Sequence, residues 1–172
     1  NVRRVLIGGT DENIALLRSH LSKSWQSLIV GTFAMSMMAG KSEVLERAMQ
    51  IGKEAEFRKE ENLLKKLVTG AAKEQRAVLS LDTTLQALRD GRVQSLVITD
   101  GYRESAYRCQ GCGYTTTVEM PNCQYCGSAF SQIPDAVELV VHDIMRSGGE
   151  VEVLQQEHKV DGFTNIGALL RY

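Results

Sequence analysis

The sequence predicts an α/β protein made of two domains, residues 1–72 and 73–172. Three observations support this prediction. Short β-branched runs alternate with stretches in which apolar residues recur every three or four positions, which is the order of an α/β layer. The regular pattern stops near residues 70–80 and then starts again. It is broken once more between residues 106 and 130, where all four cysteines lie, so we expect an insert there.

The composition is that of an ordinary globular protein and narrows the choice of partner. Of the 172 residues, 43% are hydrophobic and 24% are charged, which is enough for a packed core. Residues 1–80 carry 13 Lys and Arg against 9 Asp and Glu, whereas residues 81–172 carry 7 against 12. This balance excludes a broad nucleic-acid surface in the second half and favours a protein partner or a small basic patch.

The expected location is the cytoplasm, without contact to a membrane. No apolar run approaches the length of about 18 residues that a transmembrane helix needs. The first residues also lack the apolar region of a signal peptide. All cysteines occur in two Cys-x-x-Cys pairs, which fits metal binding in a reducing compartment better than a secreted disulfide framework.

The first elements predicted are a strand, a helix and a second strand. Residues 2–7 are apolar and β-branched, and the turn Gly8-Gly9-Thr10 follows them. Thr10 can cap the next helix, and residues 28–31 favour a short strand. The Gly-Gly-Thr turn matches neither a P-loop nor a dinucleotide fingerprint, and the acidic residues after it would repel phosphate. We therefore interpret it as an ordinary strand-to-helix turn.

A long helix is expected next, over residues 42–69. Ser42 is a suitable N-cap, and Gly70 is a suitable end. Charges of both signs recur at a spacing of four along this stretch, so pairs such as Glu61 with Lys65 are expected on an exposed face.

The second half repeats the alternation of helix and strand. We expect a helix capped by Asp82 and a buried strand at residues 96–99. After the insert, Pro134 suits the first turn of another helix. A strand at residues 150–154 and a terminal helical element at 166–170 complete the chain. This order predicts a three-layer α/β/α unit.

The insert contains two knuckles of sequence Cys-x-x-Cys-Gly, separated by ten residues. Each knuckle directs two thiolates at one centre, and the glycine after the second cysteine permits a tight backbone. Two knuckles supply the closed tetrahedral set of a structural zinc site, so we predict a zinc ribbon at residues 106–130. The alternative is a pair of disulfides or one redox pair. The predicted Zn²⁺ ligands are Cys109, Cys112, Cys123 and Cys126.

No catalytic residue is predicted. His20, His142 and His158 lie far apart on different expected elements, and no recognisable nucleophile motif accompanies them. Four protein ligands also leave no open coordination position for catalysis by the metal.

The C-terminal segment, residues 161–172, resembles a segment of a known protein family. Residues 161–172 contain Gly-Phe, Ile-Gly and Leu-Arg-Tyr, and resemble the closing segment of archaeal and eukaryotic class I peptide chain release factors. Residues 81–99 are similar to the opening of the same third domain. Residues 4–46 resemble part of the second domain, best in the bacterial release-factor-like branch.

The resemblance implies a fold for each half. Residues 1–72 would be a partial RNase-H-like α/β domain. Residues 73–172 would be an α/β/α sandwich like that of small RNA-binding ribosomal proteins, with the zinc ribbon inserted. In the family this last domain contacts a translational GTPase. The resemblance marks these residues for partner binding: Gly162, Phe163, Gly167 and Arg171.

The resemblance also implies a function in translation. Release factors hydrolyse peptidyl-tRNA with a Gly-Gly-Gln motif, and this sequence contains none. We expect the motif, if the protein has it, upstream of Asn1, so that this chain is a binding and docking portion without hydrolytic activity. The expected role is ribosome-associated: termination, rescue or dormancy. Expected partners are the ribosome or a translational GTPase, with an RNA contact. An open sheet edge would favour a homo-oligomer. The alternatives are a zinc-ribbon adaptor outside translation and a hydrolase.

Overall fold

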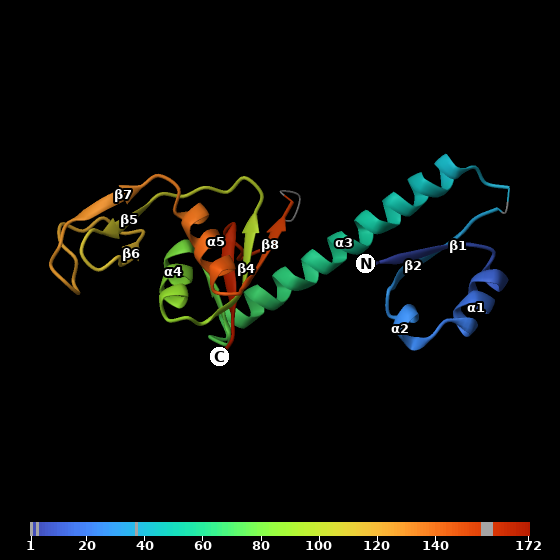
Figure 1. Cartoon of the computed structure of the whole chain (residues 1–172), viewed down its shortest axis with the longest axis horizontal. Coiled ribbons are helices and arrows are strands. Elements are labelled where there is room, and N and C mark those ends of the chain that lie inside the picture. The colour runs from blue at the N-terminus through green and yellow to red at the C-terminus, as the bar shows by residue number, and fades with distance from the viewer. Residues whose placement is uncertain (1, 3, 37, 156–159) are drawn as a thin grey trace. The chain divides into compact units, whose positions relative to one another are not determined.

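The structure is a computed structural model of the whole chain (Figure 1). It describes residues 2, 4–36, 38–155 and 160–172. The chain divides into two compact units, Asn1–Glu60 and Glu61–Tyr172, and the division falls inside one long helix. Among the described residues, no helix combines the length and apolarity that a membrane crossing requires.

The first unit contains a two-stranded parallel sheet. Its elements are β1 (Val5–Gly9), α1 (Asp11–His20), α2 (Lys23–Gln26), β2 (Ile29–Ala34) and the first part of α3 (Lys41–Ala72). Thr10 caps α1 as predicted, because its Oγ1 accepts a hydrogen bond from the Asn13 N–H at 3.4 Å. β1 lies later than predicted and includes Gly8, which pairs with Phe33 of β2. A Cβ at Gly8 would lie 2.7 Å from the Phe33 ring, so a larger residue here would have to displace that ring.

Helix α3 continues past its predicted end. Gly70 lies inside it, and the helix ends only at Ala72, before Glu74 adopts a positive φ of 53°. The Gln75 N–H donates to the Gly70 carbonyl at 2.8 Å. A Cβ at Gly70 would lie 2.9 Å from the Gln75 carbonyl oxygen, so this glycine serves the close return of the chain rather than the helix end. Ser42 lies within the helix and does not cap it.

The second unit is built on a four-stranded sheet in the order β3-β9-β4-β8. β9 runs antiparallel to both of its neighbours, and β4 pairs with β8 in parallel. The terminal element predicted as a helix is therefore wrong: it is β9, inside the sheet. β3 was not predicted at all. The elements are β3 (Ala77–Leu79), α4 (Leu81–Arg89), β4 (Val93–Thr99), α5 (Ala136–Arg146), β8 (Glu150–Leu154) and β9 (Ile166–Leu170).

Helices cover both faces of this sheet (Figure 1). On one face, α4 and α5 bury Leu85 and Val140 against Leu96 of β4. On the other face, the last turns of α3 bury Leu64 and Leu67, which pack with residues of β3, β4, β8 and β9. Leu64 and Leu67 are fully buried, so the end of α3 is an integral layer of the second unit.

Two helix caps differ from the predicted ones. Ser80, not Asp82, caps α4, because its Oγ accepts from the Thr83 N–H at 3.5 Å. Asp82 lies in the first turn, where its carboxylate is free to bind elsewhere. Pro134 precedes the cap of α5, and Asp135 is the capping residue.

Candidate metal centre

The insert forms a small sheet of its own, with the strand order β6-β5-β7. Its strands are β5 (Ala106–Cys109), β6 (Thr115–Thr116) and β7 (Phe130–Ile133), all paired antiparallel. Cys109 ends β5, Cys112 follows in the first knuckle, and the second knuckle lies between β6 and β7. The spacing of the two knuckles thus brings residues 17 positions apart onto one centre.

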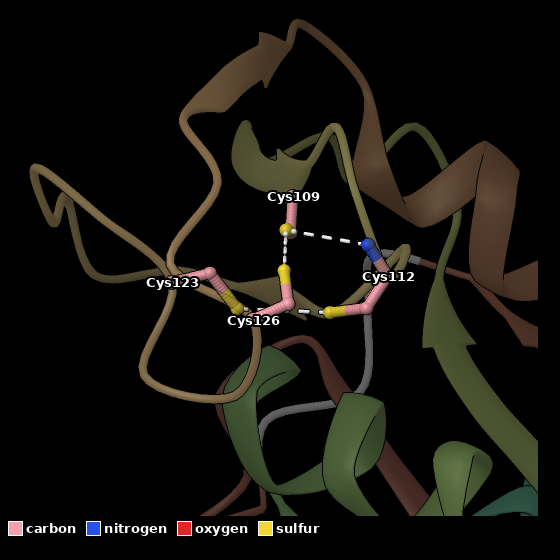
Figure 2. Close-up of side chains that lie close together, drawn as sticks. All are labelled: Cys109, Cys112, Cys123 and Cys126. Atoms are coloured by element: carbon pink, nitrogen blue, oxygen red, sulfur yellow. Dashed lines mark hydrogen bonds between the residues drawn. The ribbon is translucent and has the colours of Figure 1, made fainter.

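The four cysteine sulfurs lie together, and their side chains point at a common centre (Figure 2). All four Sγ atoms lie within 4.8 Å of one another. The Sγ atoms of Cys109 and Cys126 are 3.3 Å apart, and those of Cys112 and Cys123 are 3.6 Å apart. Sulfurs about 2.3 Å from one tetrahedral ion would lie about 3.8 Å apart, so the donor set fits a thiolate-bound metal. No disulfide joins the four cysteines in this structure.

The two knuckles have the same backbone geometry. The Gly113 N–H donates to the Cys109 carbonyl at 3.1 Å, and the Gly127 N–H donates to the Cys123 carbonyl at 2.8 Å. Both glycines have a φ of about +74°, as the sequence pattern required. Backbone N–H groups of Gly111 and Cys112 also donate to the Cys109 sulfur, at 3.4 and 3.5 Å.

The acidities of the thiols differ sharply across the cluster. Hydrogen bonds from the Ser128 hydroxyl and backbone N–H lower the pKa of Cys126 to about 6. The Tyr114 N–H lowers the pKa of Cys112, but desolvation and the three neighbouring thiols outweigh it and raise this pKa to about 11. Four sulfurs this close cannot all ionise without a counter-charge. A divalent cation bound at the centre would supply that charge.

The carboxylate of Asp82, in the first turn of α4, anchors the insert to the second unit. Asp82 Oδ1 accepts hydrogen bonds from the Thr116 hydroxyl at 3.3 Å, the Thr117 N–H at 3.5 Å and the Thr117 hydroxyl at 3.4 Å. Thr116 is only 2% exposed, so its hydroxyl needs a partner within the protein. Asp82 therefore fixes β6 against the first turn of α4.

A cation–aromatic contact anchors the second knuckle. The Arg89 guanidinium lies 4.1 Å from the ring centre of Tyr125 and 5.2 Å from that of Tyr114. The two rings meet edge to face at 4.8 Å. Tyr125 stands between Cys123 and Cys126, so Arg89 contacts the loop that carries these two cysteines. This attaches the ribbon to the last turn of α4.

Asp82 and Arg89 were not predicted as site residues. They stand seven positions apart, which places them on one face of α4, two turns from each other. A polar stripe on a helix that packs against the cysteine-containing insert is the signal that could have found them.

The residues that the family resemblance marked lie at and near β9. Gly167 is buried, and a Cβ there would lie 2.8 Å from the Val78 carbonyl oxygen. Any part that it has in partner binding is therefore indirect. Phe163 is half-buried against the α3 side of the sheet, whereas Gly162 and Arg171 are exposed.

The histidines do not form a site among the described residues. His20 ends α1 in the first unit, and His142 lies on α5 in the second. His142 Nδ1 lies 3.3 Å from Asp143 Oδ1 on an exposed surface. His158 lies outside the described residues.

The fold and the cysteine cluster together define an α/β domain with an insert whose four thiols could hold a metal ion. Residues 57–172 match the family described as eRF1 domain 3, and the chain belongs to this family. Residues 1–53 match the bacterial archaeo-eukaryotic release factor family 10. These matches confirm the resemblance of the C-terminal segment, residues 161–172, to the release-factor family.

Solved structures agree on the fold. The C-terminal domain of a peptide chain release factor from Methanosarcina mazei is 19% identical, with a TM-score of 0.51, covering 81% of this chain and 98% of that one. Pelota from Archaeoglobus fulgidus is 15% identical (TM-score 0.53), and Dom34 from S. cerevisiae is 13% identical (TM-score 0.62). Each of the two matches covers 99% of the present chain. The present chain, however, spans only 49% of the length of Pelota and 46% of the length of Dom34. A comparison with curated proteins finds no match.

Proposed function

We propose that this chain is the docking portion of a cytoplasmic, ribosome-associated release-factor-like protein that acts in termination, rescue or dormancy. The observation that carries the proposal is the membership of residues 57–172 in the eRF1 domain 3 family. Dom34, which has the same fold, is described as a translation termination-like factor that interacts with Hbs1. An archaeal Pelota of this fold is described as ribosome-bound together with ABCE1. A ribosome or a translational GTPase is accordingly the proposed partner.

The proposed metal is Zn²⁺, in a structural role. Four thiolates with short mutual distances form a closed tetrahedral set, which is typical of structural zinc and leaves no open position for a reacting water. Cys109, Cys112, Cys123 and Cys126 would hold it. The ion would fold the ribbon, and α4 would then present the ribbon as part of the docking surface. We assign no catalytic residue to this chain.

The domain division and the partner-binding residues belong to the same proposal. We assign residues 1–72 to a partial second domain of RNase-H-like type and residues 73–172 to the third domain, with the end of α3 shared between them, because Leu64 and Leu67 pack on the sheet of the third domain. Exposed Gly162 and Arg171, with half-buried Phe163 beside them, are the residues we assign to partner contact. Gly167 would support them by keeping β9 close to β3.

The experiment is co-sedimentation of the purified chain with bacterial ribosomes over a salt series. Metal content is measured on the same protein, and about one zinc per chain is expected. We expect binding that persists at moderate salt and is lost in Cys126→Ser. Gln124→Ala is the matched control, because it changes an exposed residue of the same knuckle without removing a ligand. It should bind like the unchanged chain.

One outcome would overturn the proposed role of the ribbon in docking, and another would overturn the proposed role in translation. Binding that is equal in Cys126→Ser and Gln124→Ala would remove the ribbon from the docking surface. A zinc-loaded, folded chain that binds neither ribosomes nor a translational GTPase would favour an adaptor outside translation.

A further inference from the structure

A hollow on the second unit collects basic side chains, away from the cysteine cluster. It measures about 860 Å³ and lies between the end of α3, the turn before β3, and the start of β4. One acidic residue, Glu74, also lines it. The basic residues that line it are Lys65, Lys66, Lys73, Arg76 and Arg92. They are 5 of the 11 Lys and Arg residues between residues 61 and 172, a stretch that carries 14 Asp and Glu. The positive charge is thus local, on a unit that is acidic overall.

Most of these cations have no carboxylate to neutralise them. Lys65 pairs with Glu61 at 2.7 Å. Within the described part of the chain, no carboxylate lies at ion-pair distance from Lys66, Lys73 or Arg76. All three of these residues are exposed. Their charges are therefore available to an anionic partner.

The polar groups on α3 form a line rather than a pocket for one small anion. Asn62, Lys66 and Thr69 follow at intervals of four and three, which places them on one face of α3. Lys73 is the first residue after the helix and continues this row, because its N–H still donates to the Thr69 carbonyl at 3.2 Å. At 1.5 Å per residue, this row extends over about 16 Å. It lies at the C-terminal end of α3, where the helix dipole disfavours any anion, so the side-chain cations must supply the attraction. Several phosphates in an extended chain suit this geometry better than one.

An aromatic ring stands at the rim of the hollow. Tyr172 is 67% exposed, and the Arg92 guanidinium lies 5.9 Å from its ring centre. Arg92 Nε and Nη2 also donate to the main-chain oxygen of Tyr172, at 3.2 and 2.9 Å, so the arginine is held in place. Exposed tyrosines next to arginines are stacking surfaces for unpaired bases. This feature favours a nucleic acid over an acidic peptide.

We propose that this basic hollow binds the phosphate backbone of single-stranded RNA, with a base stacked on Tyr172. Lys66, Lys73 and Arg76 contact phosphates, and Arg92 orients the stacking ring. The choice of RNA rests on the proposed function, since a ribosome-associated protein meets RNA. The hollow is a separate surface from the ribbon, because none of its lining residues comes from the insert.

The test is fluorescence anisotropy of a labelled single-stranded RNA of about 20 nucleotides with the full 172-residue chain, over a salt series. Three phosphate contacts predict a slope of log K against log salt of about −2. The double variant Lys66→Ala/Lys73→Ala removes two of the three phosphate contacts. The slope should therefore become shallower, at about −0.7, and the affinity for RNA at 0.1 M salt should decrease about 25-fold.

The matched control is Lys23→Ala/Lys53→Ala, which makes the same change of charge at two exposed lysines of the first unit. It should bind RNA within about twofold of the unchanged chain. Tyr172→Ala should weaken binding without changing the salt slope, because stacking involves no ion release. A DNA of the same sequence should bind no more tightly than the RNA.

Three results would overturn the inference: an unchanged salt slope in Lys66→Ala/Lys73→Ala, tighter binding of the DNA, or equally effective competition by poly-glutamate. The measurement contains no ribosome, so its failure is distinct from failure of the proposed function. Ribosome binding that depends on Cys126 would stand even if the RNA does not bind.

Discussion

The sandwich of the second unit and its insert bury very different side chains. The sandwich buries leucines, isoleucines and valines on both faces of its sheet, and Leu64, Leu96, Val140 and Ile166 are fully inaccessible. Between residues 106 and 130, only four residues are buried. They are Ala106, Cys109, Thr116 and Cys123. Two of these four are metal-ligand candidates and one is polar.

The difference indicates which forces fold each region. Burial of apolar area stabilises the sandwich by about 25 cal/mol per Å², and its helices and strands supply enough of it. The insert has almost no apolar interior, so hydrophobic burial cannot hold it together. Its order must come from the sulfur cluster and from the contacts to α4.

Removal of the metal is expected to unfold the insert and leave the sandwich folded. Zinc-binding domains without a core lose their structure when the metal is chelated. In hydrogen exchange after chelation, the N–H groups of Gly113 and Gly127 should lose their protection, since their acceptors belong to the two knuckles. The N–H of Thr99, which bonds the Asn165 carbonyl in the sandwich, should stay protected. Protection of both knuckles without metal would show that the insert folds by itself.

Truncation of a core side chain of the sandwich is expected to destabilise the sandwich and to leave the metal content of the insert unchanged. Leu96 is fully buried in the middle of the sheet, so Leu96→Ala should lower the free energy of unfolding by about 2–5 kcal/mol. Urea denaturation measures this change, and the metal content of the folded protein should not change. The control is Val118→Ala, which removes an exposed apolar side chain of the insert and should cost less than about 0.5 kcal/mol. Loss of metal in folded Leu96→Ala would contradict the separation of the two regions.

The same contrast explains what the sequence could predict. The clustering of the four cysteines was predictable because they are close in sequence and each knuckle is set by local turns around glycine. The long amphipathic α3 was predictable from its period, although its end was not. Gly70 is a plausible helix stop by itself, and only the return of the chain at Gln75 explains why the helix passes it.

The failures concern elements that are defined by distant partners. β9 is buried at four of its five residues, so it has no alternation of apolar and polar residues that would mark a strand. β3 has only three residues and exists because β9 pairs with it. Asp82 is a suitable cap in sequence, but Ser80 takes that position and Asp82 binds Thr116 and Thr117 instead. No local pattern contains that information.

Loss of the Asp82 carboxylate is expected to loosen the insert without unfolding it. Asp82→Ala leaves the buried Thr116 hydroxyl without its acceptor, which should cost about 1–3 kcal/mol. Hydrogen exchange in β6 measures this as faster opening of the insert. Asp82→Asn keeps one acceptor oxygen and should recover a large part of the loss. Equal exchange rates in the two variants would instead assign the effect to the negative charge at the start of α4.

The smallest effect is expected at Arg89, which is exposed and makes its contacts to the insert at a water-facing site. Arg89→Ala should shift the thermal midpoint of the whole chain by less than about 2 °C, because exposed cation–aromatic contacts contribute little to global stability. Its effect should be local. The Gly127 N–H in the second knuckle should exchange faster, whereas the Gly113 N–H in the first knuckle changes less, because Arg89 lies closer to Tyr125 than to Tyr114. Arg89→Lys keeps the charge but loses the planar guanidinium that stacks on the ring, so it should resemble Arg89→Ala more than the unchanged chain. If Arg89→Lys behaves like the unchanged chain, the contact depends on charge alone and the planar stacking adds nothing.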